Sequence, residues 1–495
     1  MSRIIIQNGN MCELDLPLKF AQKLYAEFAI RHPNAFYLRT RQRGMQNWDG
    51  KIHYINKHGE FKIGLLPAVY EKCIEYGIKP KVVDMRQPLP KVNGVVTKIG
   101  EYKLRPEQEK AVKAVINNKV GKVPFQIGVL DYTVNAGKTL IMSSLYLSYK
   151  KELKTLLITN DSDWLNQARE EFKQYLPGEN ITFVQGKVLN WSNFTIGMVQ
   201  SISRNMRFYQ KELSQIDMVL IDEADQGGSK QYQNVITRLF NTRVRIGLSG
   251  TIYMSKLAKD RVKNMNLRCF FGNVLAEFKL KDSIRKGYST KTIVKMVPGK
   301  PWYGNWESDC ISYKEIYDDT ITENKKARKM ALSRLKWNLS YGRYPALVVC
   351  KHIAHCENLY KFFKKKLGDA YNIAYVHVDT PTKRRQQIMK DFREGKIDIL
   401  VSTTIIARGK NFPKLRYLLN AASMDSQEKS IQFLGRLVRT DESKSRVYLD
   451  DLHYPGNYLD RHGKHRKQYY QRQELKVILL DTLWKKHPNH SLTNS

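Results

Sequence analysis

A lysine in a glycine turn has the clearest chemistry in this sequence. Lys138 lies in the run Asn135-Ala136-Gly137-Lys138-Thr139, which follows an apolar segment of strand type. A Gly-Lys-Thr turn between a strand and a helix cradles phosphates with its backbone N–H groups, and the hydroxyl of its threonine reaches Mg²⁺. We therefore expect these five residues to bind a nucleotide, with Lys138 as a catalytic residue and Thr139 as a magnesium ligand.

An acidic cluster supplies the second half of such a site. The apolar run 218–221 ends in Asp222-Glu223-Ala224-Asp225. Acidic side chains at the end of a buried strand can hold Mg²⁺ and position the water that attacks a γ-phosphate. The order and spacing of the two motifs predict hydrolysis of a nucleoside triphosphate. Asp222 is the expected metal ligand, Glu223 the residue that orients water, and Asp225 a further residue of the nucleotide site.

Two arginines complete the candidate site. Gln432, Arg436 and Arg439 follow a Gln-x-x-Gly-Arg-x-x-Arg pattern, and the spacing places both arginines on one face of a predicted helix. Guanidinium groups aimed at a γ-phosphate stabilise the transition state and contribute about 10³–10⁵ in rate. A solvated basic face would explain the charge but not this spacing, so we expect both arginines to be catalytic.

The strands and helices that must position these residues follow the same sequence pattern in two successive regions of the chain. Short apolar runs alternate with helical patterns from residue 104 to about residue 288, and a second series of apolar runs covers residues 346–449. Continuous apolar runs of this kind are typical of parallel strands buried on both faces. The sequence therefore predicts an α/β fold with two tandem parallel-sheet domains, and a nucleotide in the cleft between them.

The same patterns divide the chain into four regions. We expect an α+β amino-terminal domain over 1–98, a nucleotide-binding domain over 99–288, a second α/β domain over 289–455 and a basic helical tail over 456–495. The amino-terminal domain should contain a helix over 18–30. In the tail, residues 473–484 have apolar side chains near helical spacing, and a packed terminal helix and a nucleic-acid contact explain them equally well.

Composition favours a polyanionic partner. The chain has 84 Lys and Arg against 47 Asp and Glu, a net charge of +37, which favours nucleic acid over an acidic membrane. The six cysteines form no Cys-x-x-Cys pair, which argues against a zinc ribbon or a disulfide framework. Cys350 has His352 nearby, but the strand-like run 346–350 favours a core position over a metal site. No apolar run approaches the roughly 20 residues of a membrane span, and we expect a cytosolic protein.

With these motifs the sequence resembles a superfamily 2 helicase, which implies two RecA-like domains and ATP with Mg²⁺ as cofactors. Arg105-Pro106-Glu107-Gln108 resembles the element that reads adenine. Ser249-Gly250-Thr251 resembles the motif that couples ATP and nucleic-acid sites, and Ser402-Thr403-Thr404 with Ala407-Arg408-Gly409 resembles a motif that touches the bound strand. A DEAD-box RNA helicase is disfavoured, because the coupling motif reads Ser-Gly-Thr rather than Ser-Ala-Thr.

The resemblance implies two further sets of contacts. The residues it adds to the nucleotide site are Arg105, Gln108, Gly409 and Gln432. The residues it assigns to nucleic acid are Gln200, Ser249, Thr251, Ser402 and Thr403.

The amino-terminal region narrows the resemblance. Asn47-Trp48-Asp49-Gly50-Lys51-Ile52, followed by the segment 61–67, resembles the leading domain of phage UvsW-type helicases. That resemblance implies an ATP-dependent DNA helicase that acts on branched DNA, in Holliday-junction migration, fork regression and R-loop unwinding, in the cytoplasm of an infected cell. Arg41, Arg43 and Trp48 are the candidate DNA contacts. Core packing explains Trp48 equally well, and a solvated strand edge explains the basic segment 39–43.

Several alternatives remain open. An RNA helicase, or a duplex translocase that separates no strands, would carry the same motifs. A nucleic-acid-binding scaffold with a degenerate ATP site is a third reading, because Thr133, Val134 and Asn135 replace the usual small residues of the phosphate loop. Asn411 stands where many relatives have an acidic residue. The motor subunit of a nuclease complex is a fourth reading. No motif identifies a protein partner, an oligomeric state or a direction of movement.

Overall fold

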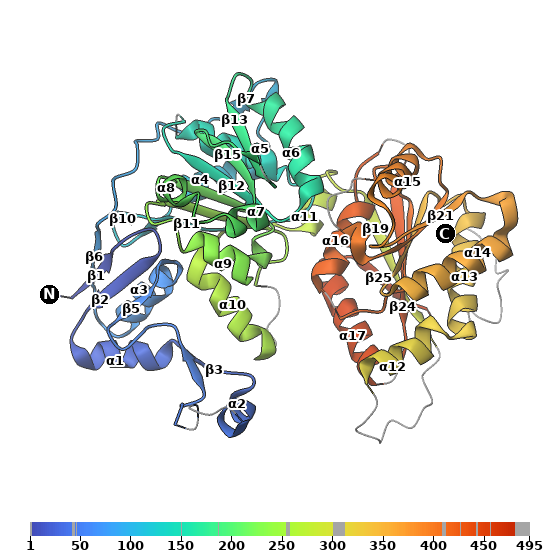
Figure 1. Ribbon diagram of the computed structural model, residues 1–495, viewed down its shortest axis with the longest axis horizontal. Coiled ribbons are helices and arrows are strands. Elements are labelled where there is room, and N and C mark those ends of the chain that lie inside the picture. The colour runs from blue at the N-terminus through green and yellow to red at the C-terminus, as the bar shows by residue number, and fades with distance from the viewer. Residues whose placement is uncertain are drawn as a thin grey trace. The chain divides into compact units, whose positions relative to one another are not determined.

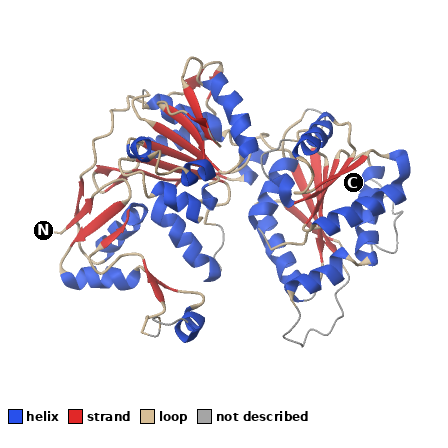
Figure 2. Cartoon of the chain, viewed as in Figure 1, coloured by secondary structure: helices blue, strands red, loops and turns tan. Residues whose placement is uncertain are grey.

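The chain forms two compact units, residues 1–278 and residues 279–495, in a computed structural model (Figure 1). Helices flank the strands of the large sheet in each unit (Figure 2). The structure describes residues 2–41, 45, 47–149, 151–186, 188–253, 258–299, 312–407, 412–425, 427–441, 444–455 and 457–480. Among these residues, no helix is both long enough and apolar enough to cross a bilayer.

A small sheet of four strands opens the first unit. Its strands are β1 (Arg3–Ile6), β2 (Met11–Asp15), β5 (Glu60–Lys62) and β6 (Lys81–Asp84), in the order β5-β2-β1-β6. The helices α1 (Leu18–Glu27) and α3 (Leu66–Glu75) bury Leu24 and Val69 in the same core as the strand residues Ile4 and Ile6. The α+β character predicted for this region is confirmed.

A helix and a hairpin project from this small sheet. β3 (Ala29–Arg31) pairs antiparallel with β4 (Lys51–His53), and α2 (Ala35–Arg41) lies between them in sequence. The predicted helix over 18–30 is therefore too long, because Ile30 pairs with Ile52 in the hairpin. Arg39 and Arg41 lie in the last turn of α2, so the strand-edge interpretation of segment 39–43 is wrong over its described part.

The small sheet shares one hydrophobic core with the α/β domain that follows it. At their contact, Arg245 is fully buried and donates to the Gly9 carbonyl oxygen at 2.6 Å, to Asn10 Oδ1 at 2.8 Å and to the Phe270 carbonyl oxygen at 3.3 Å. Burial, with a smaller contribution from the charge of Arg86, lowers the pKa of Arg245 to about 9. Gly9 is needed here, because a Cβ at that position would lie 2.6 Å from the Leu239 carbonyl oxygen.

We expect Arg245→Ala to lower the free energy of unfolding of the first unit by about 3 kcal/mol, because three buried acceptors lose their donor. Chemical denaturation followed by circular dichroism measures this change. Arg238→Ala, at an exposed position of the same unit, is the matched control and should change it by less than about 0.5 kcal/mol. Equal stabilities of the two variants would contradict the anchoring role of Arg245.

The large sheet of the first unit has eight strands in the order β14-β13-β15-β12-β16-β17-β11-β18. Its strands are β11 (Gln126–Tyr132), β12 (Thr155–Thr159), β13 (Ile181–Gln185), β14 (Val188–Leu189), β15 (Phe194–Met198), β16 (Met218–Asp222), β17 (Val244–Ser249) and β18 (Val274–Phe278). All neighbours run parallel except β14, which is antiparallel to β13. Every residue of β11, β16 and β17 is buried, as continuous apolar runs predict.

The helices of this domain are α4 (Pro106–Ile116), α5 (Lys138–Ser148), α6 (Ser162–Tyr175), α7 (Val199–Arg204), α8 (Gln210–Ser214), α9 (Lys230–Ile236) and α10 (Ala258–Phe271). Two short antiparallel pairs accompany them: β7 (Lys98–Ile99) with β8 (Tyr102–Lys103), and β9 (Lys119–Val120) with β10 (Val123–Pro124). α5 is apolar nearly all round and almost wholly buried, which fixes the helix that follows the glycine turn.

The second unit holds a parallel sheet of seven strands in the order β21-β22-β20-β23-β24-β19-β25. Its strands are β19 (Lys291–Pro298), β20 (Ala346–Cys350), β21 (Ile373–Val376), β22 (Ile399–Thr403), β23 (Tyr417–Asn420), β24 (Arg446–His453) and β25 (Lys476–Leu479). Its helices are α11 (Leu280–Arg285), α12 (Tyr313–Tyr317), α13 (Lys325–Ser340), α14 (Ile353–Leu367), α15 (Thr382–Glu394), α16 (Gln427–Leu437) and α17 (Asn457–Arg472). The prediction of two tandem parallel-sheet domains is confirmed.

Two adjacent buried carboxylates fasten helices to opposite faces of β24. Successive side chains of a strand point to opposite faces. Asp450 accepts from Arg334 Nε on α13 at 2.7 Å, whereas both oxygens of Asp451 accept from Arg466 on α17. Figure 1 shows α13 and α17 on the two sides of this sheet. α17 is therefore part of the second domain.

The tail differs from its prediction in one respect. α17 confirms a helix after residue 456, but of the two interpretations of residues 473–484 the packed terminal helix is wrong over its described part. The chain turns at Glu474, whose φ of 53° is left-handed, and β25 then pairs parallel with β19. Val477 and Ile478 are β-branched and fit an edge strand better than a helix. Residues beyond 480, Trp484 included, lie outside the described part of the chain.

Candidate functional site

The glycine turn joins the end of β11 to the start of α5. Asn135 and Gly137 both have left-handed backbones, with φ of 63° and 70°, and Gly137 caps the first turn of the helix. A Cβ on Gly137 would displace the side-chain amide of Gln108 and would strain the left-handed backbone, so glycine is favoured here. The first N–H groups of a helix have no partner within it and bind anions. Lys138 and Thr139, at the start of α5, are placed beside that anion site.

The Arg-Pro-Glu-Gln element donates hydrogen bonds to the backbone of this turn. Arg105 Nη2 donates to the Asn135 carbonyl oxygen at 3.0 Å, and Gln108 Nε2 donates to the Ala136 carbonyl oxygen at 2.9 Å. Gln108 Oε1 accepts from the Arg105 backbone N–H at 2.8 Å, so both ends of its amide are used. The structure therefore brings the predicted adenine-reading residues to the phosphate loop, where they fix its path.

The acidic cluster lies at the same edge of the sheet. β17 stands between β11 and β16, and Leu248 pairs with Leu130 on one side and with Asp222 on the other. The carboxyl ends of the three strands are thus level. The phosphate loop follows β11, the acidic cluster ends β16, and the coupling motif ends β17, which unites three motifs that are far apart in sequence.

The acidic side chains at this edge of the sheet are buried close to one another, which disfavours their charged forms. Burial raises the pKa of Asp222, and Lys138 partly offsets the effect. Burial also raises the pKa of Glu223 to about 8, with the neighbouring carboxylates of Asp222, Asp225 and Asp161 adding to the rise and Lys138 lowering it. Glu223 Oε2 is buried without a hydrogen-bond partner. A cation beside these carboxylates would relieve both the repulsion and the unmet acceptor.

A magnesium ion fits this donor set. Mg²⁺ binds proteins through one or two carboxylates and takes its remaining oxygens from phosphates and water. The predicted ligands Thr139 and Asp222 supply hard oxygen atoms at this edge. Within the described residues, no group of three or more His, Cys, Asp or Glu is placed to hold a metal ion. Cys350, in buried β20, occupies the expected core position.

The raised pKa of Glu223 predicts a pH-dependent stability. Its value rises from about 4.5 to about 8 on folding, so the folded state holds this proton more tightly and stability falls as pH rises through that window. We expect Glu223→Gln to be more stable than the wild type above pH 8 in the absence of nucleotide, with the gap closing towards pH 4.5. Thermal melts across this range measure it. Glu171→Gln is a control on α6, and a gap that does not change with pH would contradict the prediction.

The coupling motif contacts the acidic cluster directly. Ser249 Oγ donates to Asp225 Oδ1 at 2.6 Å and lies 3.0 Å from Thr251 Oγ1. Ser249 is only 2% exposed. The direct nucleic-acid contact predicted for Ser249 is therefore not supported by this geometry, because its hydroxyl is buried and used. Thr251 is half-buried beside it, and both residues are placed to transmit changes from the acidic cluster.

The other residues predicted to contact nucleic acid differ in how far they are buried. Ser402 and Thr403 end β22 as buried residues, and Ser402 Oγ donates to the Thr403 carbonyl oxygen, so a direct contact by Ser402 is not supported either. Gln200 is half-buried and donates to the Asn160 carbonyl oxygen at 3.3 Å. Trp48 donates to the Lys51 carbonyl oxygen at 2.9 Å and keeps its ring half-exposed.

Some predictions lie outside the described part of the chain. These are the ones for Arg43, Arg408, Gly409 and Asn411, together with the side chain of Gln432.

The arginine pair lies at the end of α16 in the second unit. α16 ends at Leu437, so Arg436 is in its last turn and Arg439 lies beyond it. The prediction that one helical face carries both residues is therefore wrong. The turn after the helix is instead held by the residue just before β19, since the backbone N–H of Thr290 donates to the Val438 carbonyl oxygen at 2.8 Å. Both arginines are half-buried.

Sequence patterns missed one carboxylate of the site. Asp161 follows β12 and acts electrostatically on both Asp222 and Glu223. β12 is the neighbour of β16 in the sheet. A usable signal was its place after an apolar run, because carboxyl ends of parallel strands gather at one edge.

Each of the two units contains a segment that matches a known protein family. Residues 101–254 match the family "Type III restriction enzyme, res subunit", and residues 329–441 match "Helicase conserved C-terminal domain". The ATP-dependent DNA helicase uvsW of Enterobacteria phage T4 is 20% identical over 472 residues, covering 88% of this chain and 90% of the phage protein. IRC3 of Saccharomyces cerevisiae, named as an ATP-dependent helicase, is 24% identical over 70% of this chain, which spans 51% of the yeast protein.

Solved structures share the fold. Saccharomyces cerevisiae Dbp5 bound to RNA and ADP BeF3 has a TM-score of 0.53 at 14% identity, covering 78% of this chain and 92% of that chain. The first family match contains the phosphate loop, the acidic cluster and the coupling motif, and the second contains the arginine pair. The chain belongs to superfamily 2 of the helicases and is of the UvsW type, which makes it an ATP-dependent helicase.

Proposed function

We propose that this helicase acts on DNA and remodels branched substrates: it migrates Holliday junctions, regresses forks and unwinds R-loops during phage replication, recombination and repair. The observation that carries the proposal is the match with the DNA helicase uvsW of phage T4. That match covers 88% of this chain, a longer stretch than residues 101–441 between the ends of the two family matches. An RNA helicase and a duplex translocase that separates no strands are the alternatives.

The proposed ATP site assigns a task to each residue of the first unit. Lys138 neutralises β- and γ-phosphate oxygens, and the first N–H groups of α5 bind the phosphates. Thr139 and Asp222 hold Mg²⁺, which when bound offsets the charge that develops on the phosphate oxygens. Glu223 orients the attacking water and accepts its proton. Its raised pKa suits a residue that must take up a proton near neutral pH.

The second unit supplies the arginines in this proposal. Arg436 and Arg439 stabilise the charge of the transition state once the two domains close on ATP. Because the lysine and the arginines belong to different domains, hydrolysis is linked to domain motion. The hydrogen bond from Ser249 to Asp225 joins the acidic cluster to the coupling motif, so a change at the γ-phosphate alters the end of β17.

We assign branch recognition to the element formed by α2 and the β3–β4 hairpin. A cavity of about 550 Å³ lies within it, and its described lining includes the cations Arg31, Arg39 and Lys51 and the acidic Asp49. Cations in a concave site bind phosphates of either strand without reading sequence. This arrangement suits a junction, where recognition depends on shape.

Aromatic side chains of the same element extend the assignment. Phe36 is 79% exposed and Tyr37 is 55% exposed, and the guanidinium of Arg41 lies 5.1 Å from the Tyr37 ring centre. Exposed rings stack on unpaired bases, with about 1–3 kcal/mol for each base. We therefore propose that α2 contacts single-stranded bases at a branch, and that Arg41, Arg43 and Trp48 contact the same DNA.

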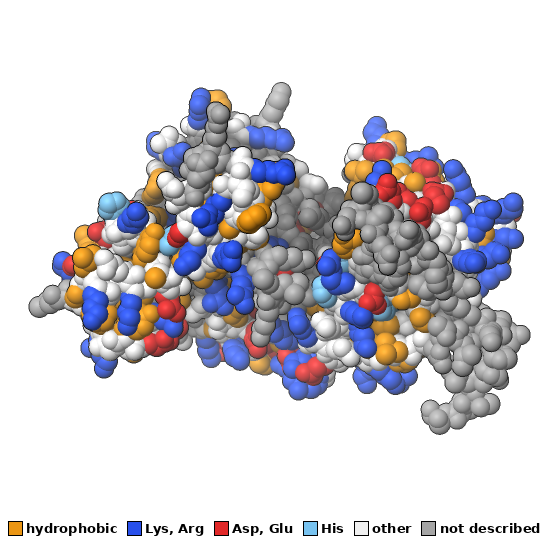
Figure 3. All heavy atoms as spheres, turned by 90° about the horizontal axis from the view of Figure 1, so that it is seen from below, with side chains coloured by type: hydrophobic (Ala, Val, Ile, Leu, Met, Phe, Trp, Pro, Cys, Tyr) orange, Lys and Arg blue, Asp and Glu red, His pale blue; other side chains and the backbone are white. Residues whose placement is uncertain are grey.

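Phosphate contacts should dominate the grip on nucleic acid. Figure 3 shows Lys and Arg side chains spread over the visible faces of both units, in keeping with the net charge of +37. Each phosphate that a cation neutralises releases counterions, so affinity falls as salt rises.

Strand displacement tests the proposed substrate. Holliday junctions, forks, linear DNA duplexes and RNA duplexes of matched sequence are compared in the presence of ATP, with phosphate release followed in parallel. The proposal predicts faster resolution of junctions and forks than of linear DNA, and none of RNA. Faster displacement of RNA would favour an RNA helicase, and DNA-stimulated hydrolysis without displacement would favour a translocase. Absence of phosphate release with and without DNA would indicate a scaffold.

A further inference from the structure

We infer that Thr290 is a positioning residue for Arg439, holding the backbone of the arginine turn through its side-chain hydroxyl. The turn comprises residues 437–440. The inference rests on the proposed catalytic role of Arg439. It assigns a function to a residue that precedes the second sheet and lies far from the arginine motif in sequence.

Three consecutive carbonyl groups of the arginine turn are held by two residues. Lys444 Nζ donates to the Leu437 carbonyl oxygen at 3.2 Å. The Thr290 backbone N–H donates to the Val438 carbonyl oxygen at 2.8 Å, and Thr290 Oγ1 donates to the Arg439 carbonyl oxygen at 3.2 Å. The hydroxyl of Thr290 thus binds the peptide group of the arginine itself.

Such a brace is needed because the turn follows a helix end. The last carbonyls of a helix have no partner within it, and buried ones must find donors elsewhere. Thr290 and Lys444 are 6% and 7% exposed, so both donor groups are largely buried. Lys444 Nζ also donates to the Leu415 carbonyl oxygen at 2.9 Å, which ties the end of α16 to the loop before β23.

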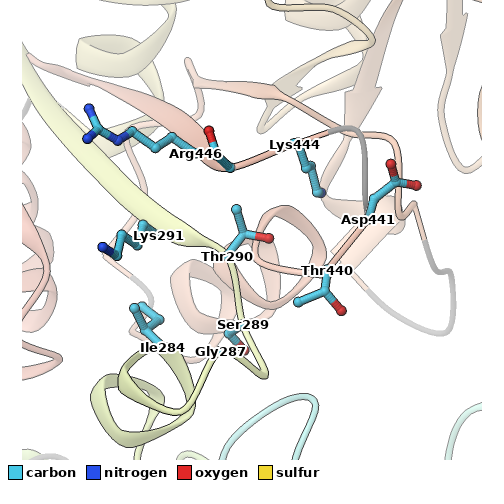
Figure 4. Close-up of a pocket in the computed structure, with 10 residues that line it drawn as sticks. Ile284, Gly287, Ser289, Thr290, Lys291, Thr440, Asp441, Lys444 and Arg446 are labelled. Atoms are coloured by element: carbon cyan, nitrogen blue, oxygen red, sulfur yellow. The ribbon is translucent and has the colours of Figure 1, made fainter.

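Packing does not fix the turn on every side. A cavity of about 720 Å³ lies beside it, lined in part by Thr290, Thr440, Asp441 and Lys444 (Figure 4). Thr440 is exposed. Where side-chain packing is incomplete, hydrogen bonds determine the backbone position, and a guanidinium one residue away moves with that backbone.

The residue that braces the turn also ends the segment by which the chain enters the second unit. This unit begins at Lys279, and α11 leads to Ser289 and Thr290. Ser283 and Ser289 lie with their hydroxyl oxygens 2.8 Å apart in a buried contact, so the segment is folded back on itself. Thr290 is therefore the point at which the entering segment is fixed to the arginine turn.

Thr290→Val tests the inference, because valine keeps the shape and the backbone N–H but lacks the hydroxyl. We expect kcat for ATP hydrolysis to fall about tenfold, with KM for ATP and DNA affinity unchanged. Thr290→Ser should restore most of the rate. Thr292→Val is the matched control, since Thr292 is a buried neighbour whose Oγ1 donates to the Thr290 carbonyl oxygen at 3.2 Å without touching the turn.

A double variant separates positioning from general destabilisation. In an Arg439→Ala background, Thr290→Val should cause no further loss of kcat, because the group that it positions is absent. Additive losses, or equal losses in Thr290→Val and Thr292→Val, would overturn the inference and leave the role of Arg439 intact. If Arg439→Ala hydrolyses ATP normally, the proposed role of Arg439 fails and this inference fails with it. If the Thr290→Val variant melts at a lower temperature than Thr292→Val, Thr290→Ala replaces it in the same double-variant comparison.

Discussion

Lys138→Ala is expected to abolish nucleic-acid-stimulated ATP hydrolysis while leaving DNA affinity within about twofold of the wild type. Lys138 starts α5 directly after the left-handed Gly137, and its charge acts on Asp222 and Glu223. Its removal takes away the positive charge for the γ-phosphate and raises the pKa of Glu223 further. Phosphate release and fluorescence anisotropy with labelled DNA measure the two properties separately.

Lys110→Ala provides the matched control for Lys138→Ala. Lys110 is an exposed residue of α4 in the same domain and should keep both activities. Parallel loss of hydrolysis and DNA binding in Lys138→Ala would point to misfolding or to a different ATP site.

Arg439→Ala is expected to lower kcat for ATP hydrolysis by about 10³–10⁵-fold, with little change in ATP affinity. A guanidinium that acts on the charge of the transition state contributes little to ground-state binding, so the two constants should separate. Single-turnover hydrolysis and binding of a fluorescent ATP analogue give the two values. Arg436→Ala should behave in the same way.

The control for the arginine pair is Arg393→Ala. Arg393 is an exposed residue in the last turn of α15, and its loss should leave kcat unchanged. An Arg439→Ala variant that loses ATP affinity but keeps its turnover would show that Arg439 binds nucleotide in the ground state only.

Local patterns predicted the parts of the fold that depend on local causes. Continuous apolar runs predicted the buried strands β11, β16 and β17, because each strand is covered on both faces whatever its neighbours are. The Gly-Lys-Thr motif predicted a turn between a strand and a helix, and the structure has that turn, with a left-handed backbone at Gly137. These features need no knowledge of distant partners.

The missed features depend on distant partners. Residues 476–479 form β25 because β19 offers them an unpaired edge, which helical spacing cannot reveal. α16 stops at Leu437 because Thr290 and Lys444 supply donors to the carbonyls at its end. A buried arginine, Arg245, fastens the amino-terminal sheet to the domain after it, whereas the sequence suggested a separate region.

The candidate site shows the same division. Each motif was recognisable, but the edge that unites them depends on strand order, which places β17 between β11 and β16. The buried contact of Ser249 with Asp225 and the electrostatic role of Asp161 follow from that order. Neither feature could be predicted from the sequence, because the residues that interact lie in separate motifs and meet only in the folded chain.

The most direct test of a joint ATP site is a cross-link between the γ-phosphate and the arginine turn. Arg439→Cys is treated with an ATP analogue that carries a thiol-reactive group on its γ-phosphate, with Arg393→Cys as the control. A site shared by the two domains predicts a DNA-dependent adduct at position 439, lost when Lys138→Ala is added. Equal labelling of positions 439 and 393, or labelling that persists without Lys138, would contradict it.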